Sequence, residues 1–445
     1  MSSVGGKCPR SCKVVRKLST DALQNEAEYD PAMRKSEQHE IEWLINKINL
    51  SALAERATFL RNGVPCVVPP LSYDRATRSR VMGGMNYHID LKFSDGVVWI
   101  ARIRRVNATS PPLKVRDAIF SSEVATLKFL EQTGVPAPKV HDFALEGPEN
   151  AIGVSYMLQE KMAGRSCSWS LANPEQKSNL LRDLADVFIE LSAHSFDSIG
   201  SPVLQPGLEI GPFARESLTD IDSNSTMKAL GPFHSLHEYH TAEIDLILDL
   251  IRRRETYAQQ PVDAYLIHLF LLEILPCITR TVDSTELGES PYFLTHPDDK
   301  GDHILVDENF HITAVIDWEW AHTVPPALAF NSPIMLFDVG EFYDGNNALS
   351  KDEEMFAELL KTKGRSDLAG YVRGGRLHHR FAFCCGYDLT DWSGFLGLFL
   401  GLRKAVGVDM DLEWEEWKRI ALERYCDDAG LKQVLAMEKD SSESR

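Results

Sequence analysis

One segment, residues 293–321, constrains the fold of this chain more than any other. It reads FLTHPDDKGDHILVDENFHITAVIDWEWA. Within it, the runs HILVD and HITAVID flank the tripeptide ENF, a pattern typical of a β-hairpin. Its side chains that can bind a metal ion or transfer a proton include His296, Asp298, Asp299, Asp302, His303 and Asp317. The segment therefore predicts a hairpin whose flanking loops carry chemically reactive groups.

The chain outside this segment changes from strand periodicity to helical periodicity. Between residues 86 and 105, apolar and polar residues alternate on both sides of Asp95-Gly96, which predicts another hairpin. Helical spacing follows over residues 116–133, and Gly134 ends it ahead of two prolines. Beyond about Pro174 the spacing is mostly helical. This order predicts an α+β fold with a small β-rich N-terminal lobe and a larger, mostly helical C-terminal lobe.

Composition narrows the classes of function. With 445 residues, the chain is long enough for two lobes that each have a core. Its formal net charge of -18 argues against a general nucleic-acid binder, because phosphate backbones repel acidic surfaces. No stretch approaches the roughly 20 apolar residues that a membrane span needs. The eight cysteines are scattered without CxxC pairs, which indicates a reduced, intracellular protein.

Two carboxylates of the 293–321 segment can share the work of phosphoryl transfer. Asp298 follows the strand ending in FLTH, and Asp317 lies where the last strand of the hairpin ends. One carboxylate could accept a proton from a hydroxyl nucleophile while the other holds Mg²⁺. Upstream, Arg102 and Glu123 could fix a cation over phosphate oxygens. The alternative is that the acids only cap turns and that Arg102 and Glu123 form a surface ion pair.

These residues resemble a known family. HPDDKGDHILVDENFHITAVIDWEWA is similar to the catalytic core of the aminoglycoside phosphotransferase and choline kinase-like superfamily, especially its fungal branch. The pattern of that branch is H-x-D, four residues, N-I-L-V-D, and then I-D-W-E. The segments GGMNYHIDLKFSDGVVWIARI, SSEVATLKFLEQTGVPAPKV, YMLQEKMAGR and GPFHSLHEYH resemble the same branch in the same order. The resemblance covers roughly residues 55–425. It implies a protein-kinase-like two-lobed fold with ATP bound between the lobes.

The resemblance also implies roles for single residues. Asp298 would be the catalytic base, Asp317 would bind Mg²⁺, and Glu123 would hold the phosphate-gripping Arg102. The hinge beside adenine would run over residues 159–162. Other residues expected to bind the nucleotide are Gly83, Gly84, Asn86, Glu160 and Met162. The implied function is an ATP-dependent phosphotransferase acting on a hydroxyl of a small molecule. The sequence does not identify this molecule, and it does not give the oligomeric state of the protein.

The same reading gives domain boundaries. Residues 1–35 are expected to form a basic tail without fixed structure, and residues 36–60 leading helices. Residues 61–160 would form the nucleotide-binding lobe, residues 161–430 the catalytic lobe, and residues 431–445 a polar tail. The basic N-terminus lacks the apolar run of a secretory signal, so a cytoplasmic location is expected, with a mitochondrial one as the second reading.

One departure from the family pattern concerns the second metal ligand. His303 stands where the family has Asn, and Asp299 replaces a hydrophobic residue. Mg²⁺ prefers oxygen ligands, so an imidazole is a poor substitute, although Mn²⁺ would suit it better. Asp302 or Asp299 could supply the missing oxygen. His303 thus supports an alternative function, a catalytically impaired, kinase-like regulatory protein that binds nucleotide.

His296 has a simpler interpretation, because it is expected to have a structural role and to hold the loop in place. A third hypothesis is a metal-dependent hydrolase built on His296, Asp298, Asp302 and His303. The spacing of these residues does not match the H-x-H-x-D-H pattern of such sites, so this hypothesis is disfavoured.

Overall fold

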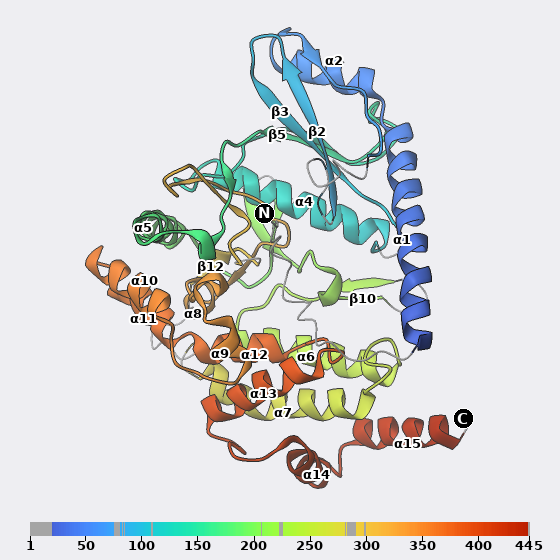
Figure 1. Ribbon diagram of the computed structural model, residues 1–445, viewed down its shortest axis with the longest axis vertical. Coiled ribbons are helices and arrows are strands. Elements are labelled where there is room, and N and C mark those ends of the chain that lie inside the picture. Colours follow the sequence, from blue (N-terminus) through green and yellow to red (C-terminus); the bar gives the residue numbers. More distant parts are fainter. Residues whose placement is uncertain are drawn as a thin grey trace. The chain divides into compact units, whose positions relative to one another are not determined.

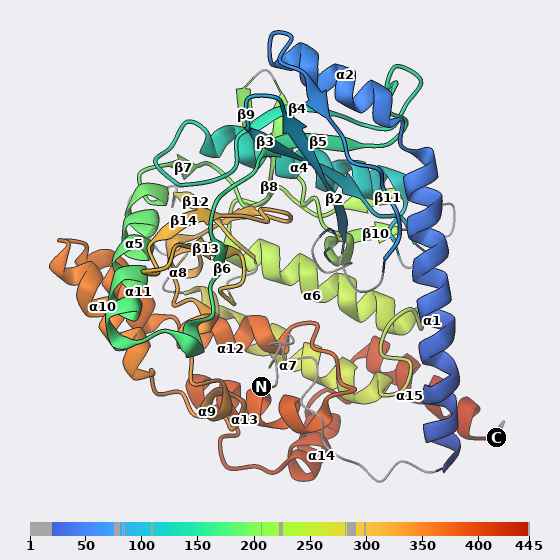
Figure 2. The same ribbon diagram turned by 45° about the horizontal axis from the view of Figure 1, so that its top comes forward.

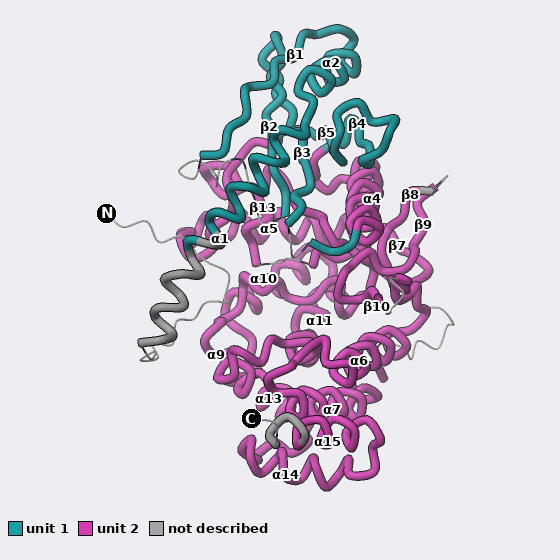
Figure 3. Tube along the Cα trace, turned by 90° about the vertical axis from the view of Figure 1, so that its right-hand side faces the viewer, with its two compact units in different colours: residues 1–112, 139–161 teal, residues 113–138, 162–445 magenta. Residues whose placement is uncertain are grey.

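The computed structural model describes residues 20–74, 81, 83, 85–107, 110–205, 207–221, 226–280, 282, 291–297 and 300–443. The chain divides into two compact units (Figure 3). The smaller unit comprises residues 1–112 and 139–161, and the larger comprises residues 113–138 and 162–445. The predicted α+β class, with a small β-rich part and a larger, mostly helical part, is confirmed.

The smaller unit is built on an antiparallel sheet with the strand order β1-β2-β3-β5-β4. The predicted hairpin at its centre is confirmed, with Asn86 paired to Arg104 and a turn at Gly96, whose φ is +89°. Alternate residues of β2, including Ile89 and Leu91, are buried, because successive side chains of a strand point to opposite faces. The strands are β1 (Cys66–Val67), β2 (Asn86–Phe93), β3 (Val98–Arg104), β4 (Val140–Ala144) and β5 (Tyr156–Glu160).

Two helices precede and cover this sheet. α1 (Thr20–Lys47) buries Ile41 and Leu44, and Ile48 just after it is also buried. α2 (Leu50–Leu60) is capped by Asn49, whose side chain accepts a hydrogen bond from the Ala52 amide. Helices were expected only from residue 36, whereas α1 begins at Thr20, within the segment expected to lack fixed structure. Residues 20–35 contain several good helix formers, such as Ala, Leu, Gln and Glu, which accounts for the longer helix.

The larger unit gathers most of its helices around α7 (Pro261–Thr279). In both views α6, α7, α12 and α13 lie side by side (Figures 1 and 2). The other helices in this unit are α4 (Leu113–Leu130), α5 (Pro174–Leu191), α6 (Leu236–Arg252), α8 (Pro326–Ala329), α9 (Val339–Tyr343), α10 (Lys351–Thr362), α11 (Ser366–Gly374), α12 (Arg376–Cys384), α13 (Trp392–Val406), α14 (Trp414–Arg424) and α15 (Ala429–Glu443).

Helix α7 corrects one expectation. It is long and apolar enough to cross a membrane by length and composition, with a mean hydropathy of 1.7, so the statement that no stretch approaches a membrane span is wrong. However, 67% of that window is buried inside the unit. A helix that is apolar all round is found in protein cores as well as in membranes. No second helix of this kind occurs among the described residues.

The C-terminal residues also differ from expectation. Residues 431–445 were expected to form a polar tail, but α15 runs to Glu443 and buries Leu431 and Val434 in the core around α7. These two residues are three positions apart and therefore lie on one face of the helix. A short apolar stripe in a polar segment is enough to dock it.

Short strands of the larger unit arrange the reactive segment. The predicted hairpin of β13 (Ile304–Val306) and β14 (Ile312–Val315) is confirmed, and β6 (Arg165–Ser166) extends it. β12 (Tyr292–Thr295) pairs with β15 (His322–Val324) and with β7 (Ser195–Phe196). The unit also contains β8 (Ser201–Gln205), β9 (Gly207–Gly211), β10 (Thr219–Ile221) and β11 (Met227–Ala229).

The helix predicted over residues 116–133 is confirmed as α4, and it groups with the larger unit rather than with the sheet that precedes it in sequence. The segment after α4 is tied to that unit by two hydrogen bonds. The Gly134 amide donates to Glu190 Oε1 at 2.8 Å, and the Val315 amide donates to Pro136 O at 2.7 Å. The chain therefore passes from the smaller unit to the larger one and back before Met162.

We expect the Phe270→Ala variant to lose about 3–5 kcal/mol of unfolding free energy, because a fully buried ring is replaced by a cavity. The Phe270 ring centroid lies 5.4 Å from that of Phe399 and 5.8 Å from that of Trp417. Urea unfolding followed by tryptophan fluorescence measures the loss. Leu171→Ala is the control, since Leu171 is 79% exposed and its loss should change stability by less than about 0.5 kcal/mol. Equal effects of the two variants would contradict a tightly packed core around α7.

Candidate active site

Strand pairing places two loops of the larger unit beside each other. Thr295 is paired with His322, and Ile304 is paired with Val315. The segment 296–303 therefore begins next to the end of the segment 316–321, and it ends next to the beginning of that segment. The amide of Ile316 also donates a hydrogen bond to the carbonyl of His303 at 2.9 Å. Groups on the two segments are brought together although about 20 residues separate them in the sequence.

His296 fastens one loop to the other. Its Nε2 lies 3.0 Å from the carbonyl oxygen of Ile316, and a carbonyl can only accept, so Nε2 is the donor. Its ring also meets the Trp318 ring edge to face at 4.8 Å. These contacts agree with the expectation that His296 has a structural role. Since Nε2 donates, this nitrogen is not a metal ligand.

His303 is buried against His296. Its side chain belongs to a residue that is 8% exposed, and the two imidazole rings stack at 4.1 Å. Burial, followed by the positive charges of His296 and Lys300, lowers the pKa of His303 to about 2. The imidazole is therefore neutral at physiological pH. Its buried Nδ1 has no hydrogen-bond partner among the described residues, which is unusual for a buried polar atom.

Asp317 is presented by a turn that only some residues tolerate. Its φ is +65°, in the left-handed region that Asp enters more readily than most residues. The next residue, Trp318, is fully buried and its Nε1 donates to the Val315 carbonyl at 2.9 Å. Trp318 thus anchors the turn while the Asp317 residue is exposed. Left-handed backbone at non-glycine residues is found often at functional sites.

The loop before β13 depends on a glycine. Gly301 has a φ of +99°, and a Cβ built there would lie 2.9 Å from Met335 Sδ. Its carbonyl accepts from the Ile304 amide at 3.1 Å, which closes the turn into the strand. On either side, Lys300 and Asp302 form an ion pair at 3.5 Å. Both side chains are well exposed, so this pair contributes little to stability.

Three of the predicted residues lie outside the described residues: the base Asp298, its neighbour Asp299, and Gly84. Among the residues that the structure describes, no group of three or more His, Cys, Asp or Glu side chains is arranged to hold a metal ion. The described members of the hydrolase set, His296, Asp302 and His303, accordingly do not form such a cluster.

Two of the predicted nucleotide residues, Gly83 and Asn86, lie near one end of the β2–β3 hairpin. Asn86 begins β2 and is buried, and its carbonyl accepts from the Gly83 amide at 3.0 Å. Arg105 was not predicted, yet it holds this loop: its Nη1 donates to the Gly83 carbonyl at 3.0 Å, and its Nε lies 2.8 Å from Glu40 Oε1 on α1. Only the adjacent arginines in IARIRR hint at such a role.

The other predicted residues are divided between the units. Arg102 is buried on β3, paired in register with Met157 of β5, and Glu160 ends β5 in the same unit. Glu123 is 3% exposed on α4 and Met162 follows the unit boundary, so both belong to the larger unit. A pairing of Arg102 with Glu123 would link the two units, and it stays a prediction.

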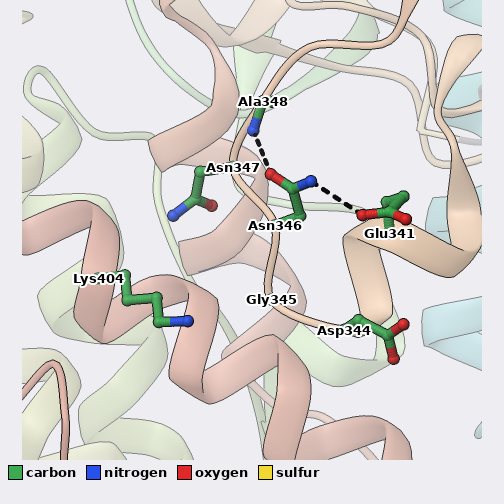
Figure 4. Close-up of a pocket in the computed structure, with 7 residues that line it drawn as sticks. All are labelled: Glu341, Asp344, Gly345, Asn346, Asn347, Ala348 and Lys404. Atoms are coloured by element: carbon green, nitrogen blue, oxygen red, sulfur yellow. Dashed lines mark hydrogen bonds between the residues drawn. The ribbon is translucent and has the colours of Figure 1, made fainter.

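A polar pocket of about 430 Å³ lies elsewhere in the larger unit (Figure 4). Asn346 spans its rim, with Nδ2 donating to Glu341 and Oδ1 accepting from the Ala348 amide, both at 2.9 Å. The buried Arg380 supports the same loop by donating to the carbonyl of Asn346 at 2.7 Å. Most of these polar groups are satisfied internally, and none of the predicted site residues lines the pocket. Its lining residues are Glu341, Asp344, Gly345, Asn346, Asn347, Ala348 and Lys404.

Known proteins resemble this chain to different degrees. It is 25% identical over 296 residues to the clavilactone A biosynthesis cluster protein Y of Ampulloclitocybe clavipes, an alignment that covers 64% of this chain and 69% of that protein. A solved structure assigned as an aminoglycoside phosphotransferase of Ralstonia eutropha JMP134 has a TM-score of 0.45 and 13% identity, covering 87% of this chain and 99% of that one. One assigned as a fructosamine-3-kinase of Thermobifida fusca has a TM-score of 0.43 and 14% identity, covering 83% and 98%.

Structural likeness at TM-scores below 0.5 does not decide the assignment. The sequence itself matches the phosphotransferase enzyme family (APH) over residues 99–332, slightly more than half of the chain. The match starts in β3 and continues past α8, so it includes β5, α4 and the whole 293–321 segment. The chain belongs to the phosphotransferase enzyme family.

Proposed function

We propose that this protein transfers the γ-phosphoryl group of ATP to a hydroxyl of a small molecule, with Asp298 as the base and Asp317 as the metal ligand. The observation that carries the proposal is the turn at Asp317. It exposes a carboxylate at a strand end, beside the loop that leads to Asp298, and buried Trp318 fixes it there. Family membership adds the phosphotransferase chemistry.

Asp298 accepts the proton of the attacking hydroxyl in this mechanism. A positioned base typically contributes a factor of about 10²–10⁴ to the rate. The carboxyl must be placed accurately, and the hydrogen bonds from His296 to the Ile316 carbonyl and from the Ile316 amide to the His303 carbonyl stiffen the chain next to it. Positioning matters because phosphoryl transfer depends mainly on alignment and charge neutralisation.

The exposed Asp317 carboxylate fits a hard divalent cation such as Mg²⁺. Such a cation, when bound, neutralises charge on the phosphate oxygens. His303 fits Mg²⁺ less well, because a neutral imidazole offers a nitrogen lone pair. Mn²⁺ suits a mixed oxygen and nitrogen set better. The metal role of His303 therefore favours Mn²⁺ as the more effective ion.

The nucleotide residues of the smaller unit complete the proposal. Arg102 would grip phosphate oxygens, with Glu123 as its partner. The loop residues would cover the phosphates, supported by the hydrogen bond from Arg105 to Gly83. The residues proposed for this loop and for the hinge are Gly83, Gly84, Asn86, Glu160 and Met162.

The acceptor is proposed to be a metabolite with a free hydroxyl. One relative is named as a member of a biosynthesis cluster, which supports a small metabolite over a macromolecule. The second candidate function is a nucleotide-binding regulator without turnover, which His303 favours because it replaces the metal-binding Asn. Thermal shift with ATP and either Mg²⁺ or Mn²⁺, followed by a phosphate-transfer assay over a hydroxyl-bearing library, separates the two. Stabilisation without any product would support the regulator.

We expect Asp317→Asn to weaken the binding of Mg²⁺-ATP by about 100-fold, because removing a charged metal ligand costs several kcal/mol. Isothermal titration calorimetry with and without Mg²⁺ measures the change. Asp186→Asn is the matched control, since the Asp186 side chain is exposed, pairs with Lys363 and lies outside the candidate site. A metal-dependent affinity equal to that of the wild type would remove Asp317 from the metal site.

We expect Asp298→Ala to lower the transfer rate by about 10²–10⁴-fold while leaving ATP affinity nearly unchanged, since a base acts in the chemical step. Single-turnover transfer and titration with a fluorescent ATP analogue report the two quantities separately. Turnover that survives at the wild-type rate would mean that another group accepts the proton.

We expect His303→Asn to raise the ratio of the Mg²⁺-supported rate to the Mn²⁺-supported rate by about tenfold, because the amide restores an oxygen ligand. Initial rates at saturating metal give the ratio. His311→Asn is the control, because His311 is an exposed histidine bound to Asp183. An unchanged ratio, or a fall in both rates, would show that His303 acts only through its stacking on His296.

A further inference from the structure

A second set of titratable side chains lies inside the larger unit, close to the strand end that leads into the loop of Asp298. His322 begins β15 and is paired with Thr295, three positions before Asp298 in the chain. Around it gather side chains from the segment before β10, from α6 and from the residue after α12. We call this set the polar cluster: Arg215, Tyr239, His240, Glu243, His322 and Cys385.

Ring contacts define the packing of the polar cluster. Phe213 stacks on Tyr239 with centroids 4.9 Å apart, and the same ring lies 5.5 Å from His322. Tyr239 in turn stacks on His240 at 4.7 Å, and His240 meets Phe381 of α12 at 4.7 Å. Four segments that are distant in the sequence therefore meet at this point.

The negative charge of the polar cluster is already compensated. His240 Nδ1 lies 3.1 Å from Glu243 Oε2. Burial raises the pKa of the Glu243 carboxyl, but the hydrogen bond and charge of His240, and then the charge of Arg215, outweigh it and the pKa lies below its ordinary value. Burial and the Glu243 charge hold the pKa values of Tyr239 and Cys385 well above their ordinary values, so both keep their protons. Glu243 is thus a carboxylate surrounded by donors.

His322 offers an acceptor. Its Nδ1 lies 3.0 Å from the carbonyl oxygen of Trp320, so Nδ1 is the donor in that bond. Burial, followed by the charge of Arg215, lowers the pKa of His322 to about 4, and the ring is neutral near pH 7. In a neutral imidazole with a proton on Nδ1, Nε2 carries a lone pair. No described residue donates a hydrogen bond to this Nε2.

The positive charge of Arg215 is not neutralised by an ion pair with any described residue. Arg215 is half-buried, and its side chain makes no hydrogen bond or ion pair with any described residue. Arg215 follows Phe213 by two residues, and the Phe213 ring contacts the rings of Tyr239 and His322, which brings this stretch of the chain to the polar cluster. The charge of Arg215 also acts on Glu243, Tyr239 and His322. A guanidinium has five N–H donors in a planar fork that matches a carboxylate. An arginine in this position would gain from an anion supplied by a ligand.

We infer that the molecule phosphorylated by this protein is an acid: its carboxylate is bound by Arg215, and an N–H or O–H group of the same molecule donates to His322 Nε2. This inference rests on the proposed function, because it assumes that the acceptor approaches the loop of Asp298. An amine-bearing acceptor would meet the positive charge of Arg215, while the one carboxylate of the cluster is already bound by His240. The acceptor class is therefore a hydroxy acid and not an amino alcohol or a polyamine.

Two matched sets of compounds test the charge preference. The aromatic set is 3-hydroxybenzoate, 3-hydroxybenzyl alcohol and 3-hydroxybenzylamine, and the aliphatic set is 3-hydroxybutyrate, 1,3-butanediol and 4-amino-2-butanol. Saturation-transfer NMR on the full chain without nucleotide measures binding. We expect at least one acid to bind about tenfold more tightly than its matched alcohol and amine. Tighter binding of either amine, or no binding of either acid at millimolar concentration, would overturn the inference.

Variants assign the preference to Arg215. Arg215→Gln should weaken acid binding about tenfold, and Arg215→Lys, which keeps the charge but not the fork, should weaken it less. Arg419→Gln is the control, because Arg419 is an exposed arginine paired with Glu423. Circular dichroism confirms that each variant is folded. Acid binding that is the same in Arg215→Gln and in wild type would overturn the assignment.

The failure of this inference is distinguishable from the failure of the proposed function. Mg²⁺-ATP binding is measured on the same preparations. If the protein binds Mg²⁺-ATP and transfers phosphate to an amine or a neutral alcohol in preference to acids, only the inference is wrong. If acids bind through Arg215 but Mg²⁺-ATP does not bind, the anion site is supported and the phosphotransferase proposal is rejected.

Discussion

The candidate site depends on the antiparallel pairing of two short strand pairs. β12 with β15 and β13 with β14 fix the beginnings and ends of the two loops that carry the reactive groups. Three-residue and four-residue strands hold weakly by themselves. The hydrogen bonds of His296 and Ile316 between the loops, and the buried indole of Trp318, add the constraint that the ladders lack. The site is therefore held by side chains as much as by the sheet.

Burial determines which groups in the larger unit are charged. Burial lowers the pKa values of His268 and His322 to about 4 and that of His303 to about 2, so these imidazoles are neutral. A neutral imidazole next to a carbonyl becomes a directional hydrogen-bonding group, because its tautomer is fixed. Because these histidines are neutral, buried positive charge comes from arginine, which stays protonated even where it is buried. Arg215 can therefore supply lasting positive charge beside His322, which His322 itself cannot.

The parts of the fold that follow from local patterns were predictable. The hairpin around Asp95-Gly96 and the helix ending at Gly134 are set by turn chemistry and periodicity within about 20 residues. The presence of Asp317 at a strand end was predictable for the same reason. Two other contacts have no local signal in the sequence. One is the stacking of His303 on His296, and the other is the chain of contacts in which Glu40 binds Arg105 and Arg105 donates to the Gly83 carbonyl. The polar cluster contains residues as distant in sequence as Arg215 and Cys385, so no local pattern predicts it. Helix α7 is apolar on all sides, and its sequence alone does not distinguish a core helix from a membrane-spanning one.

The net charge of -18 does not conflict with anionic ligands. Charges are screened over about 8 Å at physiological ionic strength, so the acidic surface acts mainly on the rate of approach. At contact distance the local cations decide, and a partly buried guanidinium interacts more strongly than an exposed one because water screens it less. During approach, an acidic surface attracts protonated amines and repels acids. Selection for an acid must therefore come from the short-range contact with Arg215, and its removal should affect dissociation more than association.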